Sequence, residues 1–201
     1  MVIFSIALVA VIMLPVLAAT KRKSNRIGCV NNLKQTALAF RVWESDNGDK
    51  YPMVVSVTKG GAMELALAGD AAGIFRAMSN KLSTPKTLIC PDDKQHSYAT
   101  NFSTDFNNSK INYFIGLDAT ESNPQNLLVG DDNLVVNGLP VKSGVLNLYT
   151  NASVAWAGAR HNFNGNFALT DGSVQQTSRS GLSNAVADNA FTNPVVRLVI
   201  P

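Results

Sequence analysis

Residues 2–19 read VIFSIALVAVIMLPVLAA, an apolar run with a single serine, and four basic residues follow it closely: Lys21, Arg22, Lys23 and Arg26. As an α-helix with a rise of about 1.5 Å per residue, this run reaches roughly 28 Å, close to the hydrocarbon thickness of a bilayer. Pro15 lies inside the run, and helices embedded in a membrane tolerate an internal proline. We therefore expect residues 1–26 to form a transmembrane helix and a basic patch at the membrane interface.

The charge of the chain is concentrated in that patch. The first 26 residues hold four of the 17 basic side chains and none of the 14 acidic ones, so residues 27–201 are close to neutral. A nucleic-acid-binding protein carries its basic surface on the folded domain, and this chain does not show that pattern. Basic side chains beside an apolar helix interact with anionic lipid headgroups. The pattern predicts membrane lipids as a partner and excludes nucleic acid.

Residues 27–201 are long enough to form one globular domain with its own core. Val30, Leu33, Ala37 and Phe40 recur at helical spacing, so the segment from Ile27 to Trp43 is predicted to be an amphipathic helix. Because only Pro15 interrupts the sequence before it, we expect one long helix whose second half packs on the body. Gly48 is suited to the left-handed C-cap, and a proline at position 52 prevents the helix from resuming.

The rest of the chain predicts an α+β fold, in which the long N-terminal hydrophobic helix packs on a mainly antiparallel sheet. Asp171-Gly172 is a favoured pair for a two-residue hairpin loop. We expect a β-prone run at Met53–Val57 and a helix at Met63–Met78. We expect strands at residues 112–116, 127–130, 134–136, 145–149, 167–170, 174–176 and 195–200.

Cys29 and Cys90 are far apart in sequence, and neither belongs to a Cys-x-x-Cys motif. His96 and His161 do not have the spacing that would complete a zinc site with them. Two alternatives remain. In an oxidising compartment the cysteines form a disulfide that closes a loop of about 60 residues and stabilises the fold by about 4 kcal/mol. Otherwise they are two buried free thiols.

His161, Asp171, Asp131 and Asp132 are the candidates for a metal or acid–base site, but the chain contains no HExxH, GxSxG or phosphate-binding loop. We expect His161 to bond a backbone carbonyl or the strand of Asp131, and Asp171 to shape its own turn. This interpretation predicts neither an enzyme nor a cofactor. Calcium could be bound at residues 46–49 or 131–132, but neither has EF-hand spacing, so solvated turns are the simpler expectation.

Four stretches occur in the order found in a known group. The first is the apolar helix with its basic patch, followed by Cys29-Val-Asn-Asn-Leu-Lys-Gln and Asp46-Asn-Gly-Asp-Lys-Tyr-Pro52. The second is Leu88-Ile-Cys-Pro-Asp-Asp93, and the third is the strand with Gly130-Asp131. The fourth is His161 with Asp171-Gly172, separated by nine residues. Together they resemble bacterial prepilin-like proteins of Verrucomicrobia and Planctomycetes, relatives of type II secretion pseudopilins and type IV pilins with a C-terminal H-x9-DG region.

The resemblance implies a structural subunit anchored in the bacterial inner membrane, with a periplasmic or extracellular body. Its partners would be lipids, other pilin-like subunits of a homo- or hetero-filament, and secretion-system assembly proteins. Cys29 and Cys90 would staple the helix to the body. His161, Asp171 and Gly172 would organise the C-terminal hairpin.

The start of the chain differs from that group, which begins with a basic leader, a Gly cleavage site and a glutamate near the fifth mature position. None of these is present, so we expect about seven mature residues upstream of Met1, or else a member that is not processed normally. The basic cluster after a short uncharged N-terminus predicts a cytoplasmic body, whereas an upstream basic leader would send the body outward. Two other classes stay open: a membrane-tethered module that binds a surface or polysaccharide ligand without polymerising, and a periplasmic enzyme using His161.

Overall fold

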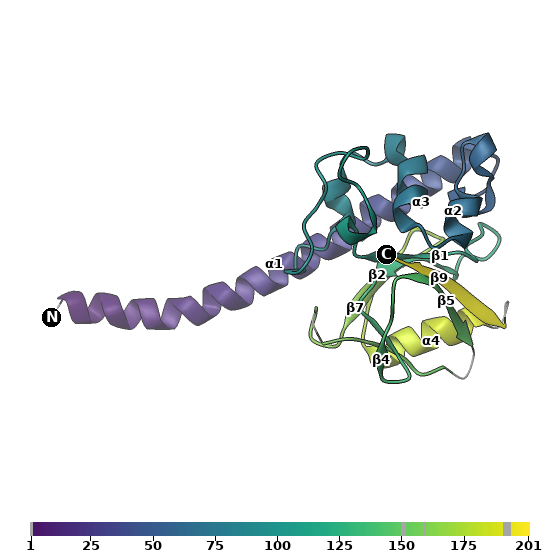
Figure 1. The fold of residues 1–201 in the computed structure, drawn as a ribbon. Coiled ribbons are helices and arrows are strands. Elements are labelled where there is room, and N and C mark those ends of the chain that lie inside the picture. The colour runs from purple at the N-terminus through teal and green to yellow at the C-terminus, as the bar shows by residue number, and fades with distance from the viewer. Residues whose placement is uncertain (1, 150–151, 159, 191–193) are drawn as a thin grey trace.

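The computed structural model describes residues 2–149, 152–158, 160–190 and 194–201, and the side chains of residues 2–19, 22 and 190 are outside this description. Helix α1 spans Val2–Asp46 without a break (Figure 1). The predicted membrane segment at residues 2–19, including Pro15, lies outside the described side chains, as does Arg22. Among the residues that are described, no helix has both the length and the apolar character needed to cross a membrane.

The body contains three further α-helices, nine strands and several short 3-10 helices within the described ranges. The α-helices are α2 (Met63–Leu67), α3 (Ala71–Ala77) and α4 (Arg179–Ala190). The strands are β1 (Tyr113–Gly116), β2 (Leu127–Asp131), β3 (Leu134–Val136), β4 (Leu139–Pro140), β5 (Gly144–Tyr149), β6 (Val154–Trp156), β7 (Gly165–Leu169), β8 (Val174–Thr177) and β9 (Val195–Ile200). The 3-10 helices are η1 (Pro52–Val54), η2 (Val57–Lys59), η3 (Ser79–Lys81), η4 (Pro85–Leu88) and η5 (Asn108–Lys110).

The strands form two antiparallel sheets, which confirms the α+β class. The larger sheet has the order β5-β9-β1-β2-β7-β8, and the smaller one has the order β4-β3-β6. The pairing between β5 and β9 has a regular register, in which Gly144 pairs with Ile200 and Tyr149 pairs with Val195. The β2–β7 pairing shifts register between Leu127 and Val129, which indicates a β-bulge.

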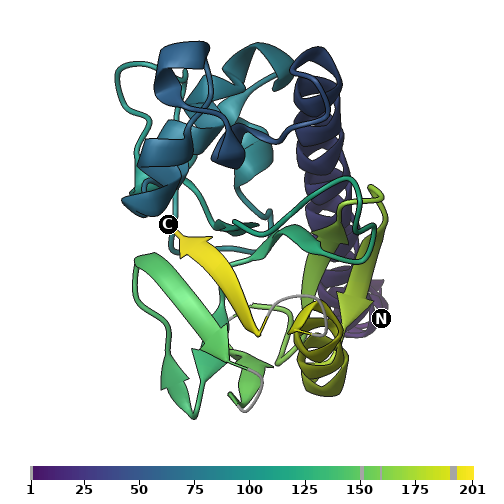
Figure 2. The same ribbon diagram turned by 90° about the vertical axis from the view of Figure 1, so that its right-hand side faces the viewer.

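Alternating side chains of the large sheet build two cores, one on each face. Tyr113 and Ile115 of β1 pack in the core shared with α1, α2 and α3, whereas Phe114 packs in the core shared with α4. Figure 2 shows α4 on the far side of the sheet from α2 and α3. This period of two is what an antiparallel sheet buried on both faces requires.

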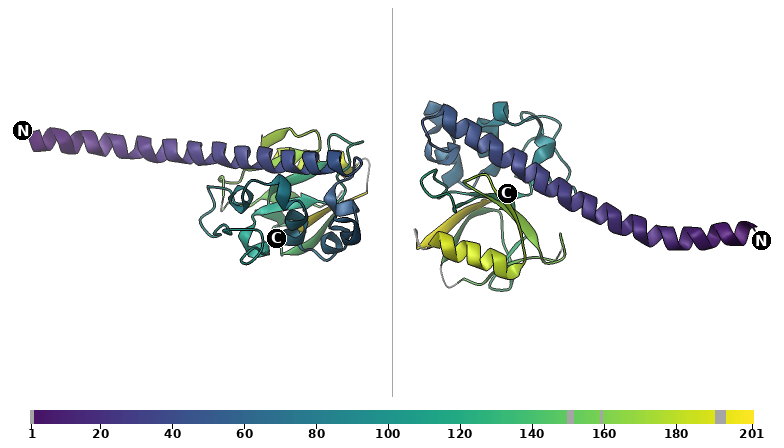
Figure 3. Two further views of the ribbon diagram at one scale, coloured as in Figure 1. Left: turned by 90° about the horizontal axis from the view of Figure 1, so that it is seen from above. Right: turned by 180° about the vertical axis from the view of Figure 1, so that it is seen from behind.

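Helix α1 packs on the sheet through the face that the sequence predicts. Leu33, Ala37 and Phe40 are fully buried, and the helix contacts β2, β7 and β8. Its N-terminal half extends well beyond the body (Figure 3). The helix ends at Asp46, and Gly48 takes a positive φ of 67°, in agreement with the predicted C-cap.

Three local predictions were wrong. Met53–Val57 is not a strand: Pro52 begins η1, and Met53 is buried within it. The predicted helix at residues 63–78 is split into α2 and α3 at Gly69, whose φ of 79° cannot continue a helix. The hairpin between β7 and β8 has a three-residue loop rather than a two-residue one. Its Leu169 N–H donates to the Ser173 carbonyl, and Gly172, at φ 84°, donates its N–H to the Leu169 carbonyl.

Candidate functional site

The candidate site lies where α1 meets the body. Cys29 of α1 and Cys90 form the predicted disulfide, with a Cα–Cα distance of 4.7 Å. The approach is close, because a Cβ on Gly28 would lie 3.1 Å from the ring of Pro91. The amide of Asn32, one turn further along α1, donates to the Ile89 carbonyl at 2.8 Å. Covalent and polar contacts therefore fix the helix to the 89–91 segment.

His161 packs directly on this disulfide. Its Nε2 atom lies 3.3 Å from Cys90 Sγ and 3.6 Å from Asp131 Oδ2, and its Nδ1 lies 3.3 Å from Asp92 Oδ2. Only 1% of the side chain is exposed. Burial lowers the pKa of His161 and outweighs the opposing charges of Asp131 and Asp92, so the imidazole is neutral at neutral pH.

The backbone around His161 is unusual, because residues 161–163 all have positive φ although none is glycine. Such conformations are costly for residues with a Cβ and persist only where the surroundings hold them. Here the side-chain amide of Asn164 donates to the carbonyls of His161 and Asn162, at 3.1 and 2.9 Å. This turn aims the imidazole inward at the disulfide.

Asp131, at the end of β2, is completely buried behind His161. Its Oδ2 accepts hydrogen bonds from the backbone N–H and the side-chain amide of Asn166, both at 2.8 Å. Burial raises the pKa of Asp131, although Arg160, His161 and Asn166 act in the opposite direction. Asn166 thus fixes the carboxyl group through Oδ2, while the buried Oδ1 has no hydrogen-bond partner among the described residues.

A second polar group surrounds Arg160, the residue before His161. Its guanidinium pairs with Asp132, lies 3.5 Å from Asp93 Oδ2, and donates to the Asn112 carbonyl at 3.3 Å. Asp93 also accepts from the Asn112 amide at 2.9 Å, while the Asn112 Oδ1 accepts from the Cys90 N–H. The disulfide segment and the ends of β1 and β2 are thereby joined through buried polar contacts.

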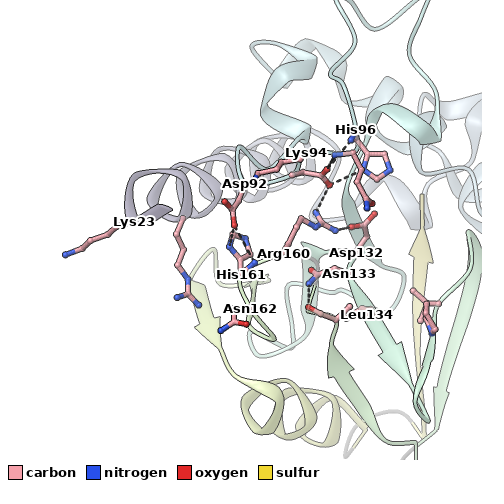
Figure 4. Close-up of a pocket in the computed structure, with 16 residues that line it drawn as sticks. Lys23, Asp92, Lys94, His96, Asp132, Asn133, Leu134, Arg160, His161 and Asn162 are labelled. Atoms are coloured by element: carbon pink, nitrogen blue, oxygen red, sulfur yellow. Dashed lines mark hydrogen bonds and ion pairs between the residues drawn. The ribbon is translucent and has the colours of Figure 1, made fainter. Parts of the chain in front are cut away.

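A cavity of about 1000 Å³ opens in front of these residues. Figure 4 shows His161, Arg160 and Asp132 around a common space, and Lys23 of α1 lies at its edge. The wall carries charges of both signs: Arg26 and Lys94 are positive, and Asp92 is negative. Because the rest of the wall is largely apolar, the cavity suits a ligand or a segment of another chain that has both apolar and polar groups.

Two groups of described residues bring metal-binding atoms together. Cys29, Cys90 and His161 lie within 4.8 Å of one another, but the two sulfurs are joined in the disulfide and so are not thiolate ligands. The second group, Glu44, Asp49 and Glu121, lies at the other end of the packed part of α1. Because both sulfurs are held in the disulfide and His161 packs on it with 1% of its side chain exposed, the first group is a structural contact.

Comparisons with family models, curated proteins and solved structures find no match for this chain.

The structure unites some of the predicted residues and separates others. Cys29, Cys90, Asp131 and His161 form one cluster, and His161 contacts the side chain of Asp131 rather than a backbone carbonyl. Asp171 and Gly172 do not belong to it. The Asp171 Oδ1 accepts from the Ser173 N–H at 2.8 Å, as expected of a residue that shapes its own turn.

The hairpin turn instead contacts α1. Arg41 donates to the Asp171 carbonyl at 3.0 Å, and a Cβ on Gly172 would lie 3.1 Å from the Arg41 guanidinium. The predicted interface residues also differ among themselves: Lys21 and Lys23 are exposed, whereas Arg26 is half-buried. Lys23 and Arg26 both line the cavity, so part of the basic patch lies against the body.

Neither predicted calcium stretch forms a site as a unit. Asp46 pairs with Lys81 at 2.5 Å, and the Asn47 amide donates to the Trp43 carbonyl at 2.7 Å. Asp131 and Asp132 are engaged by Asn166 and Arg160 respectively.

Sequence reasoning missed four members of the cluster: Asp93, Asn112, Arg160 and Asn166. Asp93 and Arg160 stand beside motif residues, Cys90-Pro-Asp-Asp and His161, so their position was a usable signal. Asn112 and Asn166 stand next to the starts of buried strands with no local signal, and only the folded sheet brings them to Asp93 and Asp131.

Proposed function

We propose that this chain is a membrane-anchored, pilin-like structural subunit of a type II secretion or type IV pilus-like filament system. The observation that carries the proposal is the attachment of α1. The helix is bonded covalently to the body at Cys29, and the part before it, with the apolar sequence of residues 2–19, extends away from the body.

This arrangement suits a filament subunit for a physical reason. An apolar helix that leaves lipid must be buried at once, and identical helices of neighbouring subunits can bury it. Head-to-tail interfaces that do not close into a ring produce helical filaments. A body fixed to its helix by a disulfide and by buried Leu33 and Phe40 would move with it during assembly.

The test uses a basic substitution in the apolar segment. Leu8→Lys places a charge near the middle of the proposed membrane helix, which costs about 3 kcal/mol on the insertion scale. We expect the wild-type chain in membranes to give a ladder of chemically cross-linked oligomers, and Leu8→Lys to lose both the membrane fraction and the ladder. Leu67→Lys is the matched control, because Leu67 is 62% exposed on α2. A wild-type chain found only in the soluble fraction would reject the proposal.

The cavity favours a second candidate, a tethered module that binds a ligand on the far side of the membrane. Its volume of about 1000 Å³ is sufficient for a small ligand. The same cross-linking experiment separates the two candidates: a tethered module would fractionate with membranes and remain monomeric. We assign no catalytic role to His161, because its imidazole is packed on the disulfide.

A further inference from the structure

Three carboxylates gather at the C-terminal end of α1, away from the disulfide cluster. Glu44 lies in the last turn of the helix, Asp49 follows in the loop, and Glu121 comes from the loop between β1 and β2. One carboxylate oxygen of each lies within 4.8 Å of the others. Side chains distant in sequence are thus brought to one point by the fold.

Glu44 is buried beside Glu121, and no described residue donates a hydrogen bond to one of its two carboxylate oxygens. It is 5% exposed, and its Oε1 atom is fully buried without a hydrogen-bond partner among the described residues. A buried carboxylate oxygen left unpaired is costly, and native structures normally satisfy such atoms. Asp49 and Glu121 are exposed, so an ion from solvent can reach the group.

The charge of the group is only partly balanced by the protein: Arg41 acts to lower the pKa of Glu44, but burial and the neighbouring carboxylates outweigh it. Among the described residues, no Lys, Arg or His forms an ion pair with any of the three carboxylates. Arg41, which lies nearby on α1, directs its guanidinium to the Asp171 carbonyl. Burial, together with the charges of Glu121 and Asp49, raises the pKa of Glu44, as expected where negative groups crowd together.

We propose that Glu44, Asp49 and Glu121 bind a hard divalent cation, Ca²⁺, between the end of α1 and the β1–β2 loop. Carboxylate oxygens are the ligands that Ca²⁺ prefers, and a flexible set of six to eight oxygens accommodates three carboxylates completed by water. The backbone supports this arrangement, since Asp49 has φ 58° and its N–H donates to the Glu44 carbonyl at 3.1 Å. The cation would fasten α1 to the sheet at the end opposite the disulfide.

The experiment is a titration of the full chain with Tb³⁺, followed by competition with Ca²⁺. Tb³⁺ emission is excited through Tyr51 and Trp43, the buried aromatic residues at this end of α1. We expect saturable emission that Ca²⁺ displaces, and a higher melting temperature in Ca²⁺ than in chelator. Glu121→Gln and Asp49→Asn should each weaken Ca²⁺ binding by about tenfold or more, because affinity follows the number of charged ligands.

Asp188→Asn is the control, since it removes an exposed carboxylate on α4 and should leave binding unchanged. The melting temperature of each variant in chelator shows that it is folded. The proposal is overturned if millimolar Ca²⁺ neither displaces Tb³⁺ nor raises the melting temperature of the wild-type chain. It is equally overturned if Glu121→Gln and Asp49→Asn bind Ca²⁺ as tightly as the control.

Discussion

His161 determines how the buried cluster responds to acid. Burial holds its pKa below the ordinary value of 6.5, so between these two values the folded chain binds fewer protons than the unfolded chain. Stability is therefore lost as the pH falls below about 6.5. The imidazole lies against Asp131 and Asp92 with Arg26 and Arg160 nearby, and these charges adjust the size of the effect without reversing it.

Replacing His161 by glutamine should remove this dependence. We expect the wild-type chain to be less stable at about pH 5.5 than at pH 7.5, while His161→Gln shows a much smaller difference. At pH 7.5 the variant should be less stable by about 1–3 kcal/mol, since Asp131 and the disulfide lose a buried polar neighbour. Urea denaturation at both pH values measures both effects. An acid loss in His161→Gln equal to that of the wild-type chain would refute the assignment.

Asp93 should govern stability at lower pH. Burial alone would raise its pKa, but hydrogen bonds from the Gln95 N–H, from His96 and from Asn112 lower it to about 2. The unfolded carboxyl group titrates near 3.8, so the stabilisation is complete above that pH and is lost as the pH falls toward 2. Asp93→Asn should cost about 2 kcal/mol at neutral pH. An acid titration followed by circular dichroism should show a smaller loss between about pH 4 and 2 in the variant.

At the scale of elements, seven of the nine strands in the described ranges were predictable because they combine β-branched or aromatic residues with bounding turns, whereas β4 and β6 were missed. Leu134–Val136 and Val195–Ile200 have the predicted bounds, and the amphipathic half of α1 has the predicted buried face. Helix α4 was missed. Its sequence contains one glycine, two serines and two asparagines. Among its described side chains, the buried apolar ones are Leu182 and Val186, four positions apart. Packing on β6 and β9, rather than propensity, stabilises it.

The site was predictable only at residues whose type or motif is recognisable in the sequence. The two cysteines indicated a disulfide, which is present, and His161 was expected near the strand of Asp131, where it lies. The contact of His161 with the disulfide was not predicted. The contacts of Asn166 with Asp131 and of Arg160 with Asp93 depend on which strand ends meet, which local sequence does not specify. The same reason explains why Asp171 lies apart from the cluster. Its spacing from His161 suggested a shared role, but Asp171 lies in the hairpin turn, where its carbonyl accepts a hydrogen bond from Arg41 of α1.

The disulfide should be the strongest single constraint on α1. Cys29 and Cys90 are 61 residues apart, and closing a loop of that length stabilises the fold by about 4 kcal/mol in the chain-entropy model. The Cys29→Ser, Cys90→Ser double variant should lose about that amount in urea denaturation. A reductant should destabilise the wild-type chain and leave the double variant unchanged. Equal stability of the oxidised wild-type chain and the double variant would show that packing alone holds the helix.

For the whole molecule, α1 is joined to the body at separated points along its packed half. The disulfide lies at Cys29, the apolar contacts run from Leu33 to Phe40, and Arg41 reaches the β7–β8 turn. Each joins the helix to a different part of the sheet or its loops. A force on the projecting half would therefore pass to the sheet as a whole, which is the mechanical property that a filament subunit needs.

Two leucines on α1 test whether the packed half of the helix belongs to the core of the body. Leu33 is 0% exposed and Leu38 is 61% exposed, so the same substitution probes both faces of one helix. Leu33→Ala should cost about 2–5 kcal/mol because it leaves a cavity against the sheet, whereas Leu38→Ala should change stability by about 0.5 kcal/mol or less. The measurement is urea denaturation of the oxidised chains, with hydrogen exchange of the α1 amides. If α1 is part of the cooperative unit, Leu33→Ala accelerates exchange in α1 and in β2 and β7 together. Faster exchange confined to α1 would mean that the helix can detach while the sheet stays folded, so that motion of the helix is not transmitted to the body.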